Sequence, residues 1–340
     1  MARIRSEYVF ALNDLKISTE ALGQTCAFKR DGCDVELTIP SDLMKFDVPE
    51  EEFLVIWHEL RHPDTNEPAP WRPVFAIRVV VRADAELGIL DFEPNRDNAV
   101  TDRAVAHDQR TAALAEHVAM EFIDWARLHG QTQLGIHGQP PERIRRSLHD
   151  EDAQRRIPLG FGGTIFARVT PEKEVIGLTN LREIGTWLCE KRALPVAETM
   201  LADAVHLAGN HPPDLQRAIL LAAIACEVKV KEALRTKAAM GIRAAIELLI
   251  QNPRDFSMPV AGFFDKAMAA ATGRSLRTDN QALYKRVDRL FQIRNRIAHS
   301  GCPPPPEAAD LINAAVQAFH WLDAVPHATD SKPAAMGQAQ

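Results

Sequence analysis

Apolar and polar side chains alternate along the first hundred residues, which is the pattern of half-buried β-strands. The segment 35–39 reads VELTI, and a period of two places one face of a strand against a core. Asp31-Gly32 separates this run from the CAF segment at 26–28, and Asp-Gly between two such runs predicts a tight hairpin. Further strands are predicted at 53–57, 74–81 and 88–92. These elements predict an antiparallel sheet or sandwich.

From residue 102 to residue 128 the apolar spacing lengthens to that of an α-helix. Leu114, Val118, Phe122 and Trp125 recur every three or four residues, and Gly130 supplies a stop. Residues 131–160 are polar and contain two adjacent prolines and several arginines, so they predict a linker. The GFGG segment at 160–163 lacks the Gly-Lys-Ser/Thr ending of a phosphate-binding loop and predicts a turn before a strand at 164–169.

Beyond Gly177 the pattern is helical throughout, and prolines and glycines separate the candidate helices. Helices are predicted at 179–191, 195–209, 213–238, 241–251, 259–272, 279–300 and 305–325. The fold class is therefore α+β, with an N-terminal antiparallel β-rich domain followed by an all-α bundle. We expect a β-rich domain at 1–100, a helix, linker and short strand at 101–175, a helical domain at 176–326 and a disordered tail at 327–340.

Composition narrows the class of protein. The formal net charge is −6, so the whole chain is not a basic nucleic-acid coat, although a local basic patch remains compatible with it. The five cysteines show no paired spacing, which favours reduced thiols over a disulfide framework. No segment approaches the roughly 20 apolar residues of a membrane span, and the first ten residues do not resemble a signal peptide. We expect a cytoplasmic protein without membrane contact.

The helix predicted at 279–300 carries a cation on its apolar stripe. Arg294 falls between Leu290 and Ile297 on that stripe, and a guanidinium there is costly unless it is paired. Glu227, on or beside the buried stripe of the helix at 213–238, is the predicted partner; the alternative is that Glu227 faces water. His299 follows Arg294 by five residues, and such positions on a straight helix point about 140° apart. The two converge only if the helix end frays or a second copy of the domain completes the site.

The stretch Leu-Tyr-x-x-Val-x-x-Leu-Phe-x-x-Arg-Asn-x-Ile-Ala-His-Ser-Gly, with Arg294, Asn295 and His299, resembles the HEPN superfamily, whose signature is Arg-x(4–6)-His. The spacing alone is not specific, because Arg110 and Arg143 also precede a histidine at such a distance. The asparagine after the arginine, the helix-end setting and the order of the helices make it specific. The resemblance covers roughly residues 180–325 and implies a helical domain that acts as a homodimer.

The resemblance also implies metal-independent cleavage of RNA, with no cofactor. Attack by the RNA's own 2′-OH needs a base that titrates near neutral pH, for which His299 is suited, and a fixed cation for the phosphate charge, for which Arg294 is suited. Asn295 would orient the phosphate or the histidine, and Glu227 would support Arg294. Cleavage would leave 2′,3′-cyclic phosphate ends. Such an enzyme would serve prokaryotic defence or a toxin system.

The motif helix is locally basic within an acidic chain. Between Ser275 and Ser300 there are six positive and two negative side chains, which gives +4, and such a stripe can contact phosphates. A solvated helix face is the alternative for most of these charges. The expected RNA contacts are Lys285, Arg286, Arg289 and Arg296.

Two other functions remain open from the sequence. The first is a non-catalytic HEPN protein that binds nucleic acid or a partner. The second is a zinc protease, because His58, Glu59 and His62 match the HExxH pattern. Pro63 and the strand-like residues before His58 argue against the helix that this chemistry needs. The N-terminal domain is expected to sense a signal or dock a regulatory partner.

Overall fold

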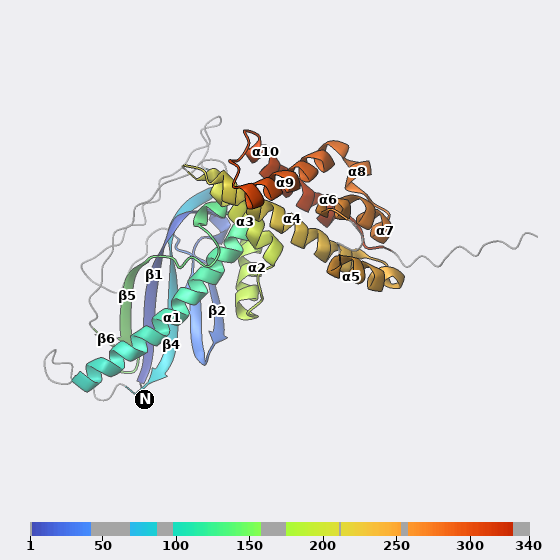
Figure 1. The fold of residues 1–340 in the computed structure, drawn as a ribbon. Coiled ribbons are helices and arrows are strands. Elements are labelled where there is room, and N and C mark those ends of the chain that lie inside the picture. Colours follow the sequence, from blue (N-terminus) through green and yellow to red (C-terminus); the bar gives the residue numbers. More distant parts are fainter. Residues whose placement is uncertain are drawn as a thin grey trace, which may run out of the picture. The chain divides into compact units, whose positions relative to one another are not determined.

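The computed structural model describes residues 2–41, 69–86, 98–157, 175–210, 212–252 and 258–328, and it divides the chain into two compact units. The first unit is Met1–Leu194 and the second is Pro195–Gln340. The first unit contains an antiparallel sheet and the second is helical (Figure 1), so the predicted α+β class is confirmed.

The sheet of the first unit has six strands in the order β2-β3-β4-β1-β5-β6, and every neighbouring pair is antiparallel. The central strand β1 is long and pairs with β4 on one side and β5 on the other. The strands are β1 (Ala2–Ser18), β2 (Thr25–Arg30), β3 (Cys33–Thr38), β4 (Trp71–Ala85), β5 (Arg143–Asp150) and β6 (Arg155–Ile157).

The predicted hairpin is confirmed between β2 and β3. Asp31 and Gly32 have φ of 52° and 78°, and Arg30 pairs with Cys33 across them. Two consecutive residues with positive φ form the two-residue turn whose twist matches that of the flanking strands. Glycine takes this backbone without strain, which explains why Asp-Gly marks the position.

Two helices cover one face of the sheet, α1 (Asn98–Leu128) and α2 (Leu178–Cys189) (Figure 1). Val118, Phe122 and Trp125 of the predicted stripe are buried, and Leu114 packs against the same core. Alternate residues of the strands complete this core, including Tyr8 and Phe10 of β1. Short 3₁₀ helices lie at Thr19–Ala21 and Thr132–Leu134 in the described part of this unit.

The helix α2 belongs to the sheet unit, whereas the sequence pattern grouped it with the helical domain. Ile176, just before it, forms a parallel bridge with Ile17 at the end of β1. Leu181, Ile184 and Leu188 then pack into the sheet's core. The division between the units therefore falls at Leu194/Pro195 and not at residue 176.

The linker predicted at 131–160 is wrong, because Arg143–Asp150 is the strand β5 and pairs with β1. Ile144 and Leu148 are buried, but three arginines in this short segment conceal the apolar alternation. The predicted strands at 53–57, 88–92 and 164–169 and the GFGG segment lie outside the described residues.

The second unit is built around α4 (Leu215–Lys237), which contacts α3, α9 and α10. The helix predicted at 259–272 is present but contains a π-helical turn at Phe263–Ala267. The other elements are α3 (Val196–Gly209), a 3₁₀ turn (Met240–Ile242), α5 (Arg243–Gln251), α6 (Val260–Gly262), α7 (Met268–Thr272), α8 (Leu276–Asp279), α9 (Gln281–Ser300) and α10 (Ala308–Ala324). Six of the seven predicted helices thus lie in this unit.

Candidate functional site

The motif lies at the end of α9, whose limits are set by side-chain and backbone caps. The Asn280 side chain accepts a hydrogen bond from the Leu283 N–H at 3.0 Å and begins the helix. Gly301 ends it in the left-handed conformation with φ of 59°, and its N–H donates to the Ile297 carbonyl. The helix is regular through Ser300.

Arg294 sits on the buried face of α9, as its spacing predicts. Leu290 and Ile297 beside it are buried, while its own side chain is 30% exposed. Its Nη2 lies 3.7 Å from Oε2 of Glu227 on α4, so the predicted ion pair is present. A pair this exposed contributes on the order of 1 kcal/mol or less to stability. Its main effect is to fix the guanidinium at one place on the helix.

Glu227 has a second cationic partner that the sequence reasoning missed. Lys231 lies one turn further along α4, and its Nζ is 2.7 Å from Oε1 of Glu227. The i,i+4 spacing of a glutamate and a lysine is the signal that predicts this contact. Lys231 also lies 5.9 Å from the ring centre of Phe263. Glu227 therefore joins two cations, one on its own helix and one on α9.

Asn295 contacts the arginine and not the histidine. Its Oδ1 accepts a hydrogen bond from Nη1 of Arg294 at 3.0 Å, and its side chain is otherwise exposed. Arg294 is thus held from two sides, by Glu227 from α4 and by its neighbour along α9. This arrangement orients the guanidinium before any ligand arrives.

His299 is exposed in the last turn of α9. Within the described part of the chain it makes no hydrogen bond or ion pair, and it does not contact Arg294. Five residues along a regular helix correspond to about 140° of rotation, so the arginine and the histidine point in different directions. One chain does not bring the two motif residues together through this helix.

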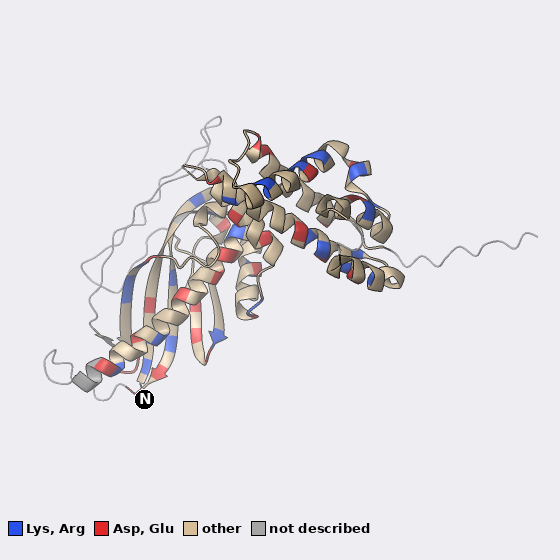
Figure 2. Ribbon diagram, in the orientation of Figure 1, with Lys and Arg blue, Asp and Glu red and all other residues tan. Residues whose placement is uncertain are grey.

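Several basic residues lie along α9 (Figure 2). The four predicted RNA-contacting residues of this helix fall into two groups. Arg286 donates to Gln317 at 2.9 Å, and Arg289 lies 3.3 Å from Glu307, at the start of α10. These two contacts tie α9 to the closing helix. Lys285 and Arg296 are exposed and form no ion pair or hydrogen bond with a described residue, so their charges face solvent.

Two further lysines of α4 were not predicted and have structural contacts. Lys229 lies 2.5 Å from Glu198 of α3 and 2.8 Å from Asp323 of α10. Burial lowers the pKa of Lys229, but hydrogen bonds to Asp323 and Glu198 outweigh burial, so the pKa is raised overall. Lys237 donates to the carbonyl groups of Leu322 and Asp323 at the end of α10. These contacts of Lys229 and Lys237 connect α4 to α3 and α10.

Beside Glu227, Cys226 is fully buried, and burial raises the pKa of its thiol to about 12. The thiol is therefore protonated and unreactive at neutral pH. Across the described residues, no three His, Cys, Asp or Glu side chains are grouped as metal ligands. His58, Glu59 and His62 lie outside those residues, so the zinc alternative stays a prediction of the sequence.

Among the described helices, none has the length and apolar character needed to cross a membrane.

Comparisons of the chain with models of protein families, with curated proteins and with solved structures gave no match. The HEPN resemblance therefore depends on the motif of α9 and on the order of the helices around it.

Proposed function

We propose that this protein is a HEPN-type, metal-independent endoribonuclease that cleaves RNA to products with 2′,3′-cyclic phosphate ends. The observation that carries the proposal is the end of α9. There Arg294 is held on the core-facing side by Glu227 and Asn295, while His299 is exposed in the last turn. A fixed cation and an accessible imidazole are the two groups that this chemistry needs.

Each motif residue has a distinct role in the proposed reaction. His299 removes the 2′-OH proton or protonates the leaving oxygen. Arg294 stabilises the negative charge that develops on the phosphate, and its planar guanidinium suits two phosphate oxygens. Asn295 holds the guanidinium through the 3.0 Å hydrogen bond. Glu227 keeps the arginine from turning into solvent.

The divergence of Arg294 and His299 on one helix supports a composite site in a homodimer. A second copy brings its own α9, so the arginine of one chain faces the histidine of the other across a two-fold axis. Lys285 and Arg296 are exposed and unpaired within the described residues and are suited to contact the RNA backbone. We place the activity in prokaryotic defence or a toxin system on the resemblance alone, with the sheet unit as the regulatory part.

The test is cleavage of end-labelled single-stranded RNA by the purified full chain in excess chelator. His299→Ala is expected to lower the rate by about 100-fold or more, which is the usual contribution of a general acid or base. The matched control is His320→Ala, which removes an exposed histidine of α10 and should leave the rate unchanged. The products should resist phosphatase until the cyclic phosphate is opened. Equal cleavage by His299→Ala and wild type would exclude the proposal.

The non-catalytic alternative predicts a different result in the same experiment. RNA would be bound but not cut, and binding would weaken when Lys285 and Arg296 are replaced together by alanine. Binding through these two charges would fall with rising salt, because phosphate contacts release counterions. Cleavage that depends on His299 excludes this alternative.

A further inference from the structure

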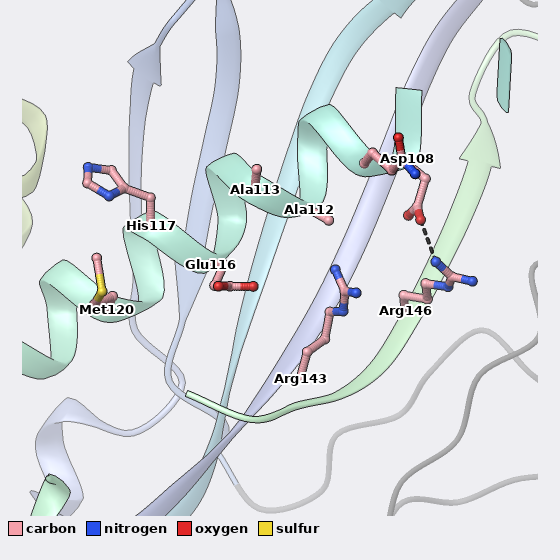
Figure 3. A pocket seen from close by; sticks show the side chains of 9 residues that line it. Asp108, Ala112, Ala113, Glu116, His117, Met120, Arg143 and Arg146 are labelled. Carbon is pink, nitrogen blue, oxygen red and sulfur yellow. Dashed lines mark hydrogen bonds and ion pairs between the residues drawn. The ribbon is translucent and has the colours of Figure 1, made fainter. Parts of the chain in front are cut away.

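A hollow of about 540 Å³ lies in the sheet unit between α1 and β5 (Figure 3). This volume is within the range of small-molecule sites. The hollow is lined by residues of the first unit, whereas the α9 motif belongs to the second unit. Its lining combines an apolar floor with charged side chains and consists of Asp108, Gln109, Ala112, Ala113, Glu116, His117, Met120, Arg143 and Arg146.

A β-bulge places two arginines of β5 on the face of the hollow. Arg146 pairs with Tyr8 of β1, a residue of the core beneath α1. In an unbroken ladder Ile144 would then lie opposite Phe10, but the register shifts and Phe10 pairs with Arg143. Residues three apart in a strand normally point to opposite faces. The bulge turns Arg143 to the same face as Arg146, a use of bulges that recurs beside functional sites.

Arg146 is fixed by a buried carboxylate. Its Nη1 lies 2.5 Å from Oδ2 of Asp108, whose side chain is only 4% exposed. The other oxygen of Asp108 accepts a hydrogen bond from the Tyr8 hydroxyl at 3.0 Å, and that hydroxyl also lies 2.7 Å from Thr111. Burial raises the pKa of Tyr8, which therefore stays a neutral donor. This network holds the Arg146 side chain in place at one wall of the hollow.

Arg143 has no such partner. Its guanidinium lies 5.9 Å from the ring centre of Tyr8, and it forms no hydrogen bond or ion pair with a described residue. Its Nε is buried and unsatisfied, and a buried donor without an acceptor is destabilising. Glu116 on α1 likewise has no partner among the described residues. Figure 3 shows both side chains extending into the hollow, one from β5 and one from α1.

We propose that this hollow binds a small molecule with a carboxylate or phosphate at one end and a hydrogen-bond donor at the other. Arg143 receives the anionic group, because its planar fork matches two oxygens and it forms no ion pair with a carboxylate of the described residues. Glu116 accepts from the donor group. Ala112, Ala113 and Met120 contact the apolar middle of the ligand. The site lies in the unit expected to receive a regulatory signal, and its occupation does not depend on RNA cleavage.

The test is thermal denaturation of the full chain with defined probes. The probes are the twenty amino acids, the four nucleoside monophosphates and inorganic phosphate, with the uncharged nucleosides as matched controls. At least one charged probe is expected to raise the melting temperature by about 5 °C at saturation. A shift in melting temperature with an amino acid identifies a carboxylate ligand, and a shift with a nucleotide identifies a phosphate ester.

The same shift is measured in three variants. Arg143→Gln and Glu116→Gln should lose it, because each removes one end of the site. Arg182→Ala removes an exposed arginine of α2 and should keep it. No shift with any charged probe in wild type, or an equal shift in Arg143→Gln, would overturn the proposal. The melting temperature of each variant without probe shows that it is folded.

Discussion

The two polar sites of this protein are built in opposite ways. At the end of α9, Arg294, Asn295 and His299 lie within six residues of one helix, and one distant partner, Glu227, fixes the arginine. Between α1 and β5, Asp108, Glu116, Arg143 and Arg146 come from separate elements and meet through strand pairing and a bulge. The arginine of the first site is already paired, whereas Arg143 of the second has no ion pair with any described residue. This contrast fits the two proposals, in which the α9 site acts on a phosphate that is already bound and the hollow captures an anion.

The experiment with the largest expected effect mixes two inactive variants to test whether the α9 site needs two chains. Arg294→Lys and His299→Ala are each expected to be inactive, by about 100-fold or more. Mixed and allowed to exchange, they should recover about a quarter of the wild-type rate, because half of the dimers are mixed and each mixed dimer holds one intact composite site. The measurement is RNA cleavage by the mixture against each variant alone. Arg294→Lys keeps the charge that pairs with Glu227, so loss of folding does not explain its inactivity.

Failure of the two variants to complement each other would show that each active site lies within one chain. The control mixture is His299→Ala with His320→Ala, which supplies a wild-type motif from one partner. It should give about half of the wild-type rate with or without exchange, because half of the chains carry an intact motif, and so it shows whether a damaged chain inhibits an intact one. A quarter of the rate in the test mixture and a larger fraction in this control together support a shared site.

A smaller effect compares the two carboxylates that hold the arginines. Asp108→Ala removes a group whose side chain is 4% exposed and which joins Arg146 to Tyr8, so it should cost about 3 kcal/mol of unfolding free energy. Glu227→Ala removes a group that is 26% exposed and should cost about 1 kcal/mol. Urea denaturation of both variants gives the comparison. Glu183→Ala, on the exposed face of α2, is the control and should change stability by less than about 0.5 kcal/mol.

Equal costs for Asp108→Ala and Glu227→Ala would contradict the view that one network is structural and the other is a positioning contact. A loss at Asp108 that disappears when Arg146 is also replaced would show that the charge pair, and not the tyrosine bond, dominates. This double-mutant cycle separates the two contacts that Asp108 makes.

The sequence predicted the α9 site because its information is local. Helical spacing alone placed Arg294 on the buried stripe, and a second stripe on α4 suggested Glu227 as its partner. The hairpin at Asp31-Gly32 was predictable for the same reason, since two neighbouring residues determine the turn. In each case the relevant residues lie within a few positions of one another, or each belongs to a periodic helix.

The α1/β5 hollow could not be predicted from the sequence, because strand register decides it. The segment that contains Arg143 and Arg146 has the polar composition of a linker. No feature of the neighbouring sequence indicates that Phe10 pairs with Arg143 after a one-residue shift. The same limit applies to α2, whose apolar stripe was recognised but whose packing partner was not. A helix shows which face it buries, but the core that receives this face depends on contacts such as the Ile17–Ile176 bridge.

The smallest expected effect is a pH dependence that belongs to the sheet unit alone. His107 of α1 is buried, and its Nε2 lies 3.4 Å from the Ser6 hydroxyl. Burial, followed by the charge of Arg110, lowers the pKa of His107 below its ordinary value of 6.5, while Asp108 acts in the opposite direction. The folded chain therefore holds this histidine neutral at a pH where the unfolded chain protonates it. The contribution to stability is fully present above pH 6.5 and is lost as pH falls through the folded pKa.

Urea midpoints of wild type and His107→Gln at pH 7.5 and pH 5.5 measure this contribution. Glutamine retains a hydrogen-bonding side chain opposite Ser6 but does not titrate, so the variant should lose less stability on acidification than wild type. His320→Ala changes an exposed histidine of the helical unit. Its urea midpoint should fall on acidification by as much as that of wild type. A variant at His107 that matches wild type at both pH values would show that this buried imidazole is not the titrating group. The difference between the two units would then depend on their carboxylates. The exposed fractions of Asp108 and Glu227 differ more than those of their partners Arg146 and Arg294.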